Sequence, residues 1–129
     1  MVIDDQPGVR RLIAEALKIA GFTVTAATDG QEALEKITLE EPSLVILDMK
    51  MPGMNGLDFL QELRRRFVTL PVIVITAYNE LELTEQASRY GVSFYLQKPF
   101  DIQELYRLVQ QFWGQNMPVV RPRVEKRGL

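Results

Sequence analysis

Five short apolar runs alternate with five amphipathic patterns along the chain, and this alternation is the strongest constraint on the fold. The runs contain few polar residues, which is typical of strands that are buried on both faces. They lie at positions 1–4, 22–27, 44–47, 71–75 and 92–96. Such strands, separated by helices, predict a parallel sheet with helices on both sides. We therefore expect an α/β fold, a doubly wound (βα)5 domain around a five-stranded parallel sheet.

The helices are predicted by apolar residues spaced three or four positions apart. In the first helical pattern this spacing runs from Val9 to Ala20 and stops at Gly21. Two later helices open on capping-box pairs, Asp29 with Glu32 and Asp101 with Glu104. The expected helices cover positions 9–20, 29–39, 57–66, 79–90 and 101–113.

Composition excludes several classes of function. The 129 residues suffice for one domain, and a net charge of −2 does not suggest a nucleic-acid binder. No apolar window reaches the length of a membrane span, so we expect a cytoplasmic protein with no direct membrane contact. The chain has no cysteine and no histidine, so it cannot use disulfides, a histidine base or a phosphohistidine of its own.

The periodic pattern breaks near position 114, which predicts a domain boundary there. Residues 1–113 are expected to form the folded domain, and residues 114–129 a basic C-terminal tail or the stub of a linker. The last sixteen residues read GQNMPVVRPRVEKRGL, with two prolines and four basic side chains. A solvated terminus is favoured over a docking segment for this stretch.

Polar side chains follow four of the five predicted strands. They are Asp4 and Asp5, Asp48, Thr76, and Lys98. In a doubly wound sheet, ligands bind outside the carboxyl ends of the strands, where these groups would meet. Each has an ordinary alternative explanation, such as a helix cap, a turn residue or a solvated charge. Four strands delivering such groups to one edge make a shared site the better interpretation.

The three carboxylates suggest a metal-assisted reaction. At roughly 5 Å in an effective dielectric near 20, each close pair would repel by about 3 kcal/mol. Lys98 offsets part of this repulsion, and oxygen ligands also suit a hard cation such as Mg²⁺. A carboxylate can act as nucleophile toward a phosphoryl group, whose oxygens Thr76 and Lys98 can bind beside the small Ala77.

Four motifs make the chain resemble the receiver domain of two-component response regulators over residues 1 to about 113. In order they are VIDD (2–5), LDMKMPGMNG (47–56), ITA (75–77) and YLQKPF (95–100). The resemblance implies the flavodoxin-like strand order 2-1-3-4-5. It also implies an acceptor of phosphoryl groups that assists its own phosphorylation and is not a conventional enzyme.

The same resemblance assigns a role to each site residue. It makes Asp48 the phosphoacceptor and Mg²⁺ the cofactor. It gives the metal ligands Asp4, Asp5, Asp48 and the backbone carbonyl of Lys50; the phosphoryl-binding and switch residues Thr76, Ala77, Lys98 and Tyr95; and a cis peptide between Lys98 and Pro99.

The motifs are most similar to those of single-domain receivers that act in a sporulation phosphorelay. Lys50 and Tyr78 share that pattern, and we expect them to screen the acceptor from water and slow its hydrolysis. The expected partners are a histidine kinase, a histidine phosphotransferase protein, or both, with no nucleic acid bound directly. Either a monomer or a phosphorylation-linked dimer fits. A receiver cut from a larger DNA-binding or enzymatic regulator is the alternative.

Two other classes of protein are built on a doubly wound parallel sheet. A magnesium-dependent aspartyl phosphatase commonly carries a second aspartate two residues after its nucleophile, where this chain has Lys50. An FMN binder of the flavodoxin type needs a hydroxyl-rich phosphate loop after the first strand, where Asp4 and Asp5 would repel a phosphate. Both are therefore disfavoured.

Overall fold

A five-stranded parallel sheet forms the centre of the molecule, in the order β2-β1-β3-β4-β5. The computed structural model describes residues 1–51, 53–77 and 81–116. The predicted tail beyond Asn116, and Tyr78, lie outside this part of the chain. Within it the strands are β1 (Val2–Ile3), β2 (Ala26–Ala27), β3 (Val45–Asp48), β4 (Val72–Thr76) and β5 (Phe94–Gln97). The predicted fold class and strand order are confirmed.

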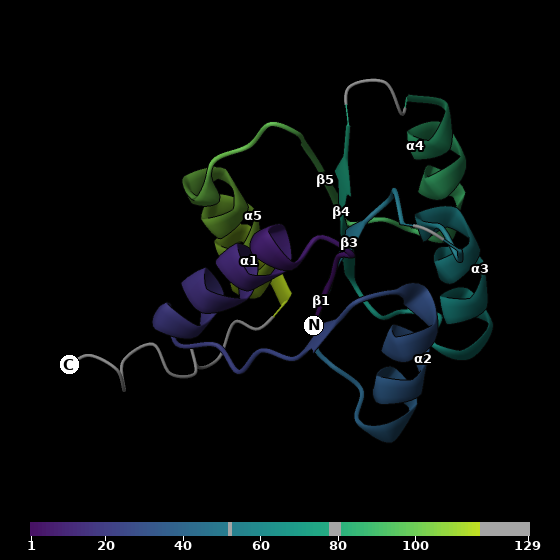
Figure 1. Ribbon diagram of the computed structural model, residues 1–129, viewed down its shortest axis with the longest axis horizontal. Helices are drawn as coiled ribbons and strands as arrows, with labels where there is room; N and C mark the ends of the chain where they lie inside the picture. Colours follow the sequence, from purple (N-terminus) through teal and green to yellow (C-terminus); the bar gives the residue numbers. More distant parts are fainter. Residues whose placement is uncertain (52, 78–80, 117–129) are drawn as a thin grey trace.

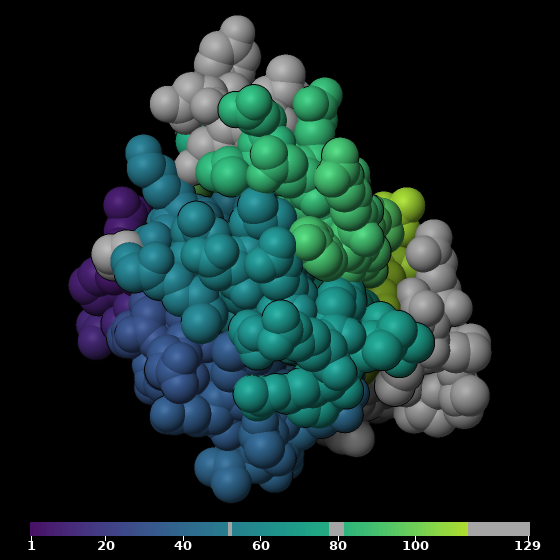
Figure 2. Space-filling view, turned by 90° about the vertical axis from the view of Figure 1, so that its right-hand side faces the viewer, coloured from purple at the N-terminus to yellow at the C-terminus, as the bar shows by residue number. Residues whose placement is uncertain are grey.

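Helices cover both faces of the sheet (Figure 1). They are α1 (Pro7–Ile19), α2 (Gly30–Leu39), α3 (Gly56–Arg66), α4 (Leu81–Ala87) and α5 (Ile102–Asn116). Helices α1 and α5 lie on one side, and α2, α3 and α4 on the other, where Figure 2 shows them as one continuous surface. None of the described helices is both long and apolar enough to cross a membrane.

Alternation along the strands divides the core into two layers. In β3, Val45 and Leu47 pack among the residues of α2 and α3, whereas Ile46 packs among those of α1 and α5. All three side chains are at most 2% exposed. Successive side chains of a strand point to opposite faces, so a strand covered on both sides must be apolar throughout. This is why LVIL in the sequence contains no polar residue.

The two predicted capping boxes differ in detail. At α5 the pair is reciprocal, because Glu104 N–H donates to Asp101 Oδ1 and Asp101 N–H donates to Glu104 Oε1, each at 3.0 Å. At α2, Glu32 N–H donates to Asp29 Oδ1, but the Glu32 carboxylate accepts from Thr28 instead. That acceptance, together with Lys36, lowers the pKa of Glu32 to about 2.

The predicted strand at 22–27 is wrong in length, since only Ala26 and Ala27 form β2. Strand β1 pairs with β2 through Val2 and Ile3 alone. Among the described residues, 22–25 have no partner in the ladder between β1 and β2, although the Thr25 carbonyl accepts a hydrogen bond from Val2 N–H. Strand-forming residues stay outside a sheet when no neighbouring strand satisfies their backbone groups.

Most other boundaries differ from the prediction by one or two residues, and three of the differences are informative. Within the range expected as one helix, 79–90, the structure has α4 at Leu81–Ala87 and then a 3-10 turn at Ser88–Tyr90. Gly91, with φ of 72°, ends this turn. The last strand begins at Phe94 rather than at position 92. Helix α5 continues to Asn116, three residues beyond the expected end at Trp113. Helix ends are the least certain feature of a periodic pattern because nearby packing can extend or tighten the last turn.

Candidate functional site

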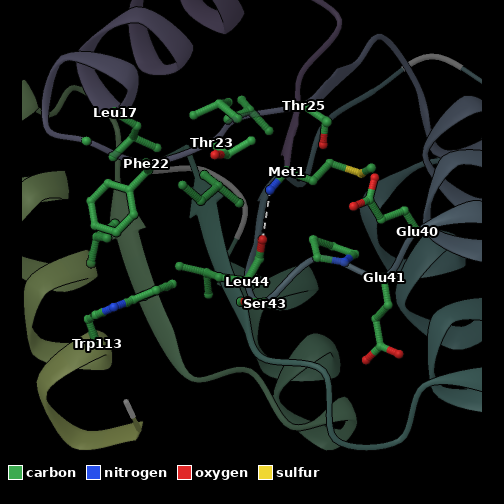
Figure 3. Close-up of a pocket in the computed structure, with 16 residues that line it drawn as sticks. Met1, Leu17, Phe22, Thr23, Thr25, Glu40, Glu41, Ser43, Leu44 and Trp113 are labelled. Carbon is green, nitrogen blue, oxygen red and sulfur yellow. Dashed lines mark hydrogen bonds between the residues drawn. The ribbon is translucent and has the colours of Figure 1, made fainter. Parts of the chain in front are cut away.

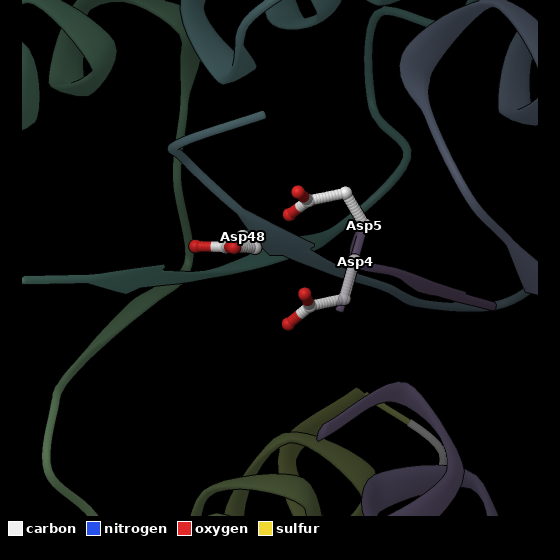
Figure 4. A group of neighbouring side chains, drawn as sticks. All are labelled: Asp4, Asp5 and Asp48. Carbon is white, nitrogen blue, oxygen red and sulfur yellow. The ribbon is translucent and has the colours of Figure 1, made fainter. Parts of the chain in front are cut away.

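The ends of β1 and β3 bring three carboxylates together. Ile3 pairs with Leu47, so the residues that follow them leave the sheet side by side. Asp4, Asp5 and Asp48 each offer a carboxylate oxygen, and these oxygens lie within 4.8 Å of one another. Figure 4 shows Asp5 and Asp4 leaving the chain on opposite sides, with the carboxyl groups of all three residues turned in the same direction. The sequence-based prediction that these residues would meet at one sheet edge is therefore what the geometry shows.

Asp4 is held in place by the start of α1. Its Oδ1 accepts from the backbone N–H of Gln6 at 2.9 Å, and its carbonyl oxygen accepts from Nη1 of Arg10 at 2.8 Å. Its Oδ2 is buried and has no hydrogen-bond partner within the described ranges. Burial raises the pKa of Asp4, against the opposing effect of the Gln6 amide. A buried carboxylate oxygen without a donor is suited to binding a cation.

Asp48 lies deepest in the cluster, with a side chain that is 2% exposed. Lys98 Nζ lies 3.2 Å from its Oδ1, and the N–H of Lys50 donates to the same oxygen at 3.4 Å. Burial, followed by the charge of Asp4, raises the pKa of Asp48 to about 6, although Lys98 acts in the opposite direction. The positive charge of Lys98 therefore does not fully offset the repulsion among the carboxylates at this edge of the sheet.

Strands β4 and β5 supply the other polar groups. Thr76 ends β4 with a side chain that is 6% exposed, and Asp48 pairs with its neighbour Ile75. The N–H of Lys98 donates to the Thr76 carbonyl at 2.8 Å, which holds the end of β5 beside β4. The peptide between Lys98 and Pro99 is cis. The hydroxyl, the ammonium and the carboxylates thus come from adjacent strand ends, with Ala77 following Thr76.

Tyr95 lies on β5, two positions before the end of the strand. Its side chain is 38% exposed, and its hydroxyl donates to the Thr84 carbonyl of α4 at 3.4 Å. Desolvation raises the pKa of this hydroxyl. Tyr95 therefore contacts α4 in this structure, which leaves its predicted role as a switch residue to be tested.

The loop after β3 is shaped by close backbone packing. Met49 and Met51 are buried, whereas Lys50 between them is exposed. The N–H of Gly56 donates to the Met49 carbonyl at 2.8 Å, and Gly53 has φ of 75°, which favours glycine. The turn residues that follow Asp48 in the sequence therefore anchor the loop while Lys50 faces solvent.

Arg10 and Gln6 were not singled out from the sequence. Arg10 acts on the cluster through space, because its positive charge lowers the pKa of Asp4 in addition to binding the Asp4 carbonyl. Its position in the first two turns of a helix after an acidic strand end was the available signal. Gln6 contributes only its backbone N–H, which any residue except proline could supply, so its side-chain type gave no signal in the sequence.

The donor set fits a metal ion. Three carboxylates converge, one buried oxygen has no donor among the residues that the structure describes, and Lys98 offsets their repulsion only in part. Such an all-oxygen set suits a hard divalent cation. Asp4, Asp5 and Asp48 are the residues that can hold it.

The comparison with protein families decides what kind of domain this is. The model of the response regulator receiver domain matches residues 1–110. The chain is a receiver domain. It belongs to the response regulators of two-component systems, as the four sequence motifs predicted.

Similar proteins include both short and long chains. Sporulation initiation phosphotransferase F of Bacillus subtilis is 37% identical over 112 residues, which cover 87% of this chain and 90% of that protein. The DNA-binding transcriptional regulator NtrC of Escherichia coli is 39% identical over 110 residues, but this chain spans only 24% of its length. The crystal structure of the receiver domain of NtrX from Brucella abortus has a TM-score of 0.80 and 31% identity, over 85% of this chain and 93% of that one.

Proposed function

We propose that the receiver domain accepts a phosphoryl group on Asp48 and passes it on as a stand-alone intermediate of a phosphorelay. The observation that carries this proposal is the juxtaposition of a buried Asp48 with a lysine 3.2 Å away and two further carboxylates. A histidine kinase or a histidine phosphotransferase would be the donor, since the chain contains no histidine. As an acceptor that is consumed and regenerated, it would not be a conventional enzyme.

The transfer moves one phosphoryl group between two proteins. A carboxylate oxygen of Asp48 forms a bond to phosphorus while the P–N bond of the donor phosphohistidine breaks. The electron pair of that bond stays on the imidazole nitrogen, and the product is an acyl phosphate on Asp48. The raised pKa of Asp48 increases the basicity of this oxygen, and near neutral pH the carboxylate is still largely ionised.

Neighbouring groups would hold the transferred oxygens. Mg²⁺ bound by Asp4, Asp5 and Asp48, with the Lys50 carbonyl, would neutralise charge that develops on the phosphoryl group. Lys98 is already 3.2 Å from Asp48 and would bind a phosphoryl oxygen. The hydroxyl of Thr76, at the adjacent strand end, would donate to another. Movement of Thr76 toward the phosphoryl group would let Tyr95 leave its contact with α4, which is a population shift between two states.

The 37% identity to sporulation initiation phosphotransferase F, over 90% of that protein, supports a role as an intermediate of a phosphorelay. The alternative is a receiver detached from a DNA-binding regulator, and the 39% identity of this chain to NtrC supports it. The position two residues after Asp48 is Lys50, which cannot act as the carboxylate acid/base of an aspartyl phosphatase.

Phosphorylation of Asp48 is tested by incubating the protein with acetyl phosphate and Mg²⁺ and measuring its intact mass. The wild-type chain should gain the mass of one phosphoryl group, and omission of Mg²⁺ should sharply reduce the gain. Asp48→Asn should gain none, because an amide cannot form the acyl phosphate. Asp58→Asn, an exposed aspartate at the start of α3, is the matched control and should behave like wild type. An equal gain in Asp48→Asn would overturn the assignment.

The lifetime of the acyl phosphate tests the role of Lys50. Lys50 is exposed and follows the acceptor by two residues, so its long side chain can cover the phosphoryl group and hinder the attack of water. In Lys50→Ala the acyl phosphate should hydrolyse several-fold faster, as measured by the decay of the phosphorylated mass. Lys18→Ala, an exposed lysine of α1, should leave the decay unchanged. An unchanged decay in Lys50→Ala would contradict the screening role.

A further inference from the structure

Residues 82–87 of α4 bury little apolar surface. Ala87 alone is buried among them, and Leu83 packs partly against the core. Helices α2 and α3 each bury four residues, and Leu17 of α1 and Trp113 of α5 pack into the apolar layer of the opposite face (Figure 3). An element with few buried apolar contacts has a low local stability. Polar contacts therefore weigh more in fixing the position of α4 than in fixing the other helices.

Arg64 ties the C-terminal end of α4 to the neighbouring helix α3. Helix α4 continues into the 3-10 turn Ser88–Tyr90, and α3 contacts both (Figure 1). Nε of Arg64 donates to the Tyr90 carbonyl at 2.6 Å, and Nη2 donates to the Gly91 carbonyl at 3.2 Å. Nη1 donates at 2.8 Å to the carbonyl of Phe67, which caps the end of α3. One guanidinium thus binds three carbonyl oxygens from two segments.

Other contacts make this end of α4 rigid. The guanidinium is a planar fork, so binding several acceptors at once fixes their relative orientation. Gln61, one turn before Arg64 on α3, donates from Nε2 to the Tyr90 hydroxyl at 2.9 Å. The Tyr90 side chain also packs against the core layer that α2 and α3 form. A charged group, an amide and an apolar contact therefore hold the residues that follow α4.

The middle of α4 has a weaker contact with the sheet. The Tyr95 hydroxyl donates to the Thr84 carbonyl at 3.4 Å, which is long for a hydrogen bond from a hydroxyl. This donor is neutral, whereas the bonds from Arg64 are charge-assisted, and the one to Tyr90 is much shorter. When α4 moves, the contact at Thr84 should therefore break before those at Tyr90 and Gly91.

We propose that Arg64 is the positioning residue of a pivot at Tyr90–Gly91, about which α4 tilts when Asp48 is phosphorylated. The trigger rests on the proposed function, whereas the pivot itself rests on the contacts of Arg64. The seven residues of α4, at about 1.5 Å each, make a helix about 10 Å long. A tilt of roughly 20° about one end of such a helix displaces the other end by about 4 Å. Translation of α4 as a whole is the alternative.

Distances between spin labels test the pivot in the full chain, which has no cysteine, so that introduced ones are labelled uniquely. One label goes on Glu82→Cys in the first turn of α4, or on Arg89→Cys beyond its end. The second goes on Glu35→Cys of α2 or on Glu15→Cys of α1, which lie on opposite faces of the sheet; all four residues are exposed. Acetyl phosphate with Mg²⁺ should shift the distances to position 82 by about 4 Å and those to position 89 by about 1 Å or less.

Two results would overturn the pivot. One is a shift of equal size at positions 82 and 89, which indicates translation. The other is no shift at position 82 in protein that intact mass shows to be phosphorylated. If no phosphoryl group is taken up, the proposed function fails, and the variants of Arg64 described next still decide whether the clamp exists.

Arg64→Gln tests the clamp without any phosphoryl group. The distances to position 89 should become more widely distributed than in wild type. Amide hydrogen exchange of residues 88–91 should quicken about tenfold or more, as expected when charge-assisted hydrogen bonds are lost. Exchange in β3 and β4 should stay as in wild type, which shows that the fold is kept. In the phosphorylated variant the distances to positions 82 and 89 should both shift, because the fixed end is gone.

Two further variants separate the clamp from the charge of α3. Arg64→Lys keeps the charge and one donor group, so its exchange rates should lie between those of Arg64→Gln and wild type. Arg65→Gln removes the next arginine, which is exposed and pairs with Glu62 at 3.2 Å, and should behave like wild type. If Arg64→Gln leaves both the distances to position 89 and the exchange of residues 88–91 as in wild type, Arg64 does not hold this end of α4.

Discussion

Asp48→Asn is expected to raise the free energy of unfolding by about 2 kcal/mol at pH 8 in the absence of divalent cations. Burial and the charge of Asp4 raise the pKa of Asp48 from 3.8 to about 6, and each unit corresponds to about 1.4 kcal/mol. The attraction of Lys98, 29% exposed, is already contained in this net shift, and solvent screening at the edge of the sheet reduces the full conversion to about 2 kcal/mol. Urea unfolding of the two proteins at pH 8 measures the difference.

The sign of the pH dependence follows from the raised pKa. Between pH 3.8 and about 6 the folded state binds the Asp48 proton more tightly than the unfolded state does. The stability that this residue contributes is therefore fully present below pH 3.8 and is lost as the pH rises through 6. The gap between Asp48→Asn and wild type should widen from pH 4 to pH 7 and then stay constant.

Two additions make this stability experiment specific to the cluster. Glu85→Gln removes an exposed carboxylate of α4 and should show no such gap. Millimolar Mg²⁺ should stabilise wild type more than Asp48→Asn, because bound cation relieves the repulsion among the carboxylates. If wild type is as stable as Asp48→Asn at pH 8, its surroundings do not destabilise the ionised carboxylate of Asp48.

Gly56→Ala is expected to destabilise the domain by about 3 kcal/mol, since the added methyl has no room. A Cβ at Gly56 would lie 2.7 Å from Met49 Cα and 2.9 Å from Met49 O, which are backbone atoms. Met49 directly follows Asp48 and its N–H donates to the Ile75 carbonyl of β4, so it cannot shift without disturbing β3. The unfolding midpoint in urea, and the affinity for Mg²⁺, should both fall.

Gly30→Ala provides a closely matched control. Both glycines are the first residue of a helix, and a Cβ at Gly30 would also meet an atom at 2.7 Å. That atom is Sδ of Met54, a partly buried and flexible side chain that can turn away. Its substitution should cost about 1 kcal/mol or less. Equal losses for the two variants would show that contact with the Met49 backbone is not the cause.

The periodic pattern predicted the fold because strands and helices alternate without ambiguity. Strands β3 and β4 are apolar at nearly every position, which only a sheet covered on both faces requires. The length of β2 was not predictable from residues 22–27, because strand formation there depends on a partner from β1. The division of α4 from its 3-10 turn was likewise set by packing rather than by periodicity.

The candidate site was predictable in membership but not in electrostatics. Asp4, Asp5, Asp48, Thr76 and Lys98 follow strand ends, and parallel topology sends all such ends to one edge. Three features of the site depend on distances in space that the spacing of residues along the sequence does not encode. They are the burial of Asp48, the Asp4 oxygen without a donor among the described residues, and the hydrogen bond from Arg10 to the Asp4 carbonyl.

By itself, the sequence determined the class of fold, the edge at which chemistry gathers and the family to which the chain belongs, because these depend on residue type and order. The tertiary structure decided that the pKa values of Asp48 and Asp4 are raised, since desolvation depends on the surrounding atoms. It also decided that the Lys98 ammonium lies 3.2 Å from the Asp48 carboxylate, which pairs groups from two separate strands. Burial and pairing are collective, so they exist only once the chain has folded.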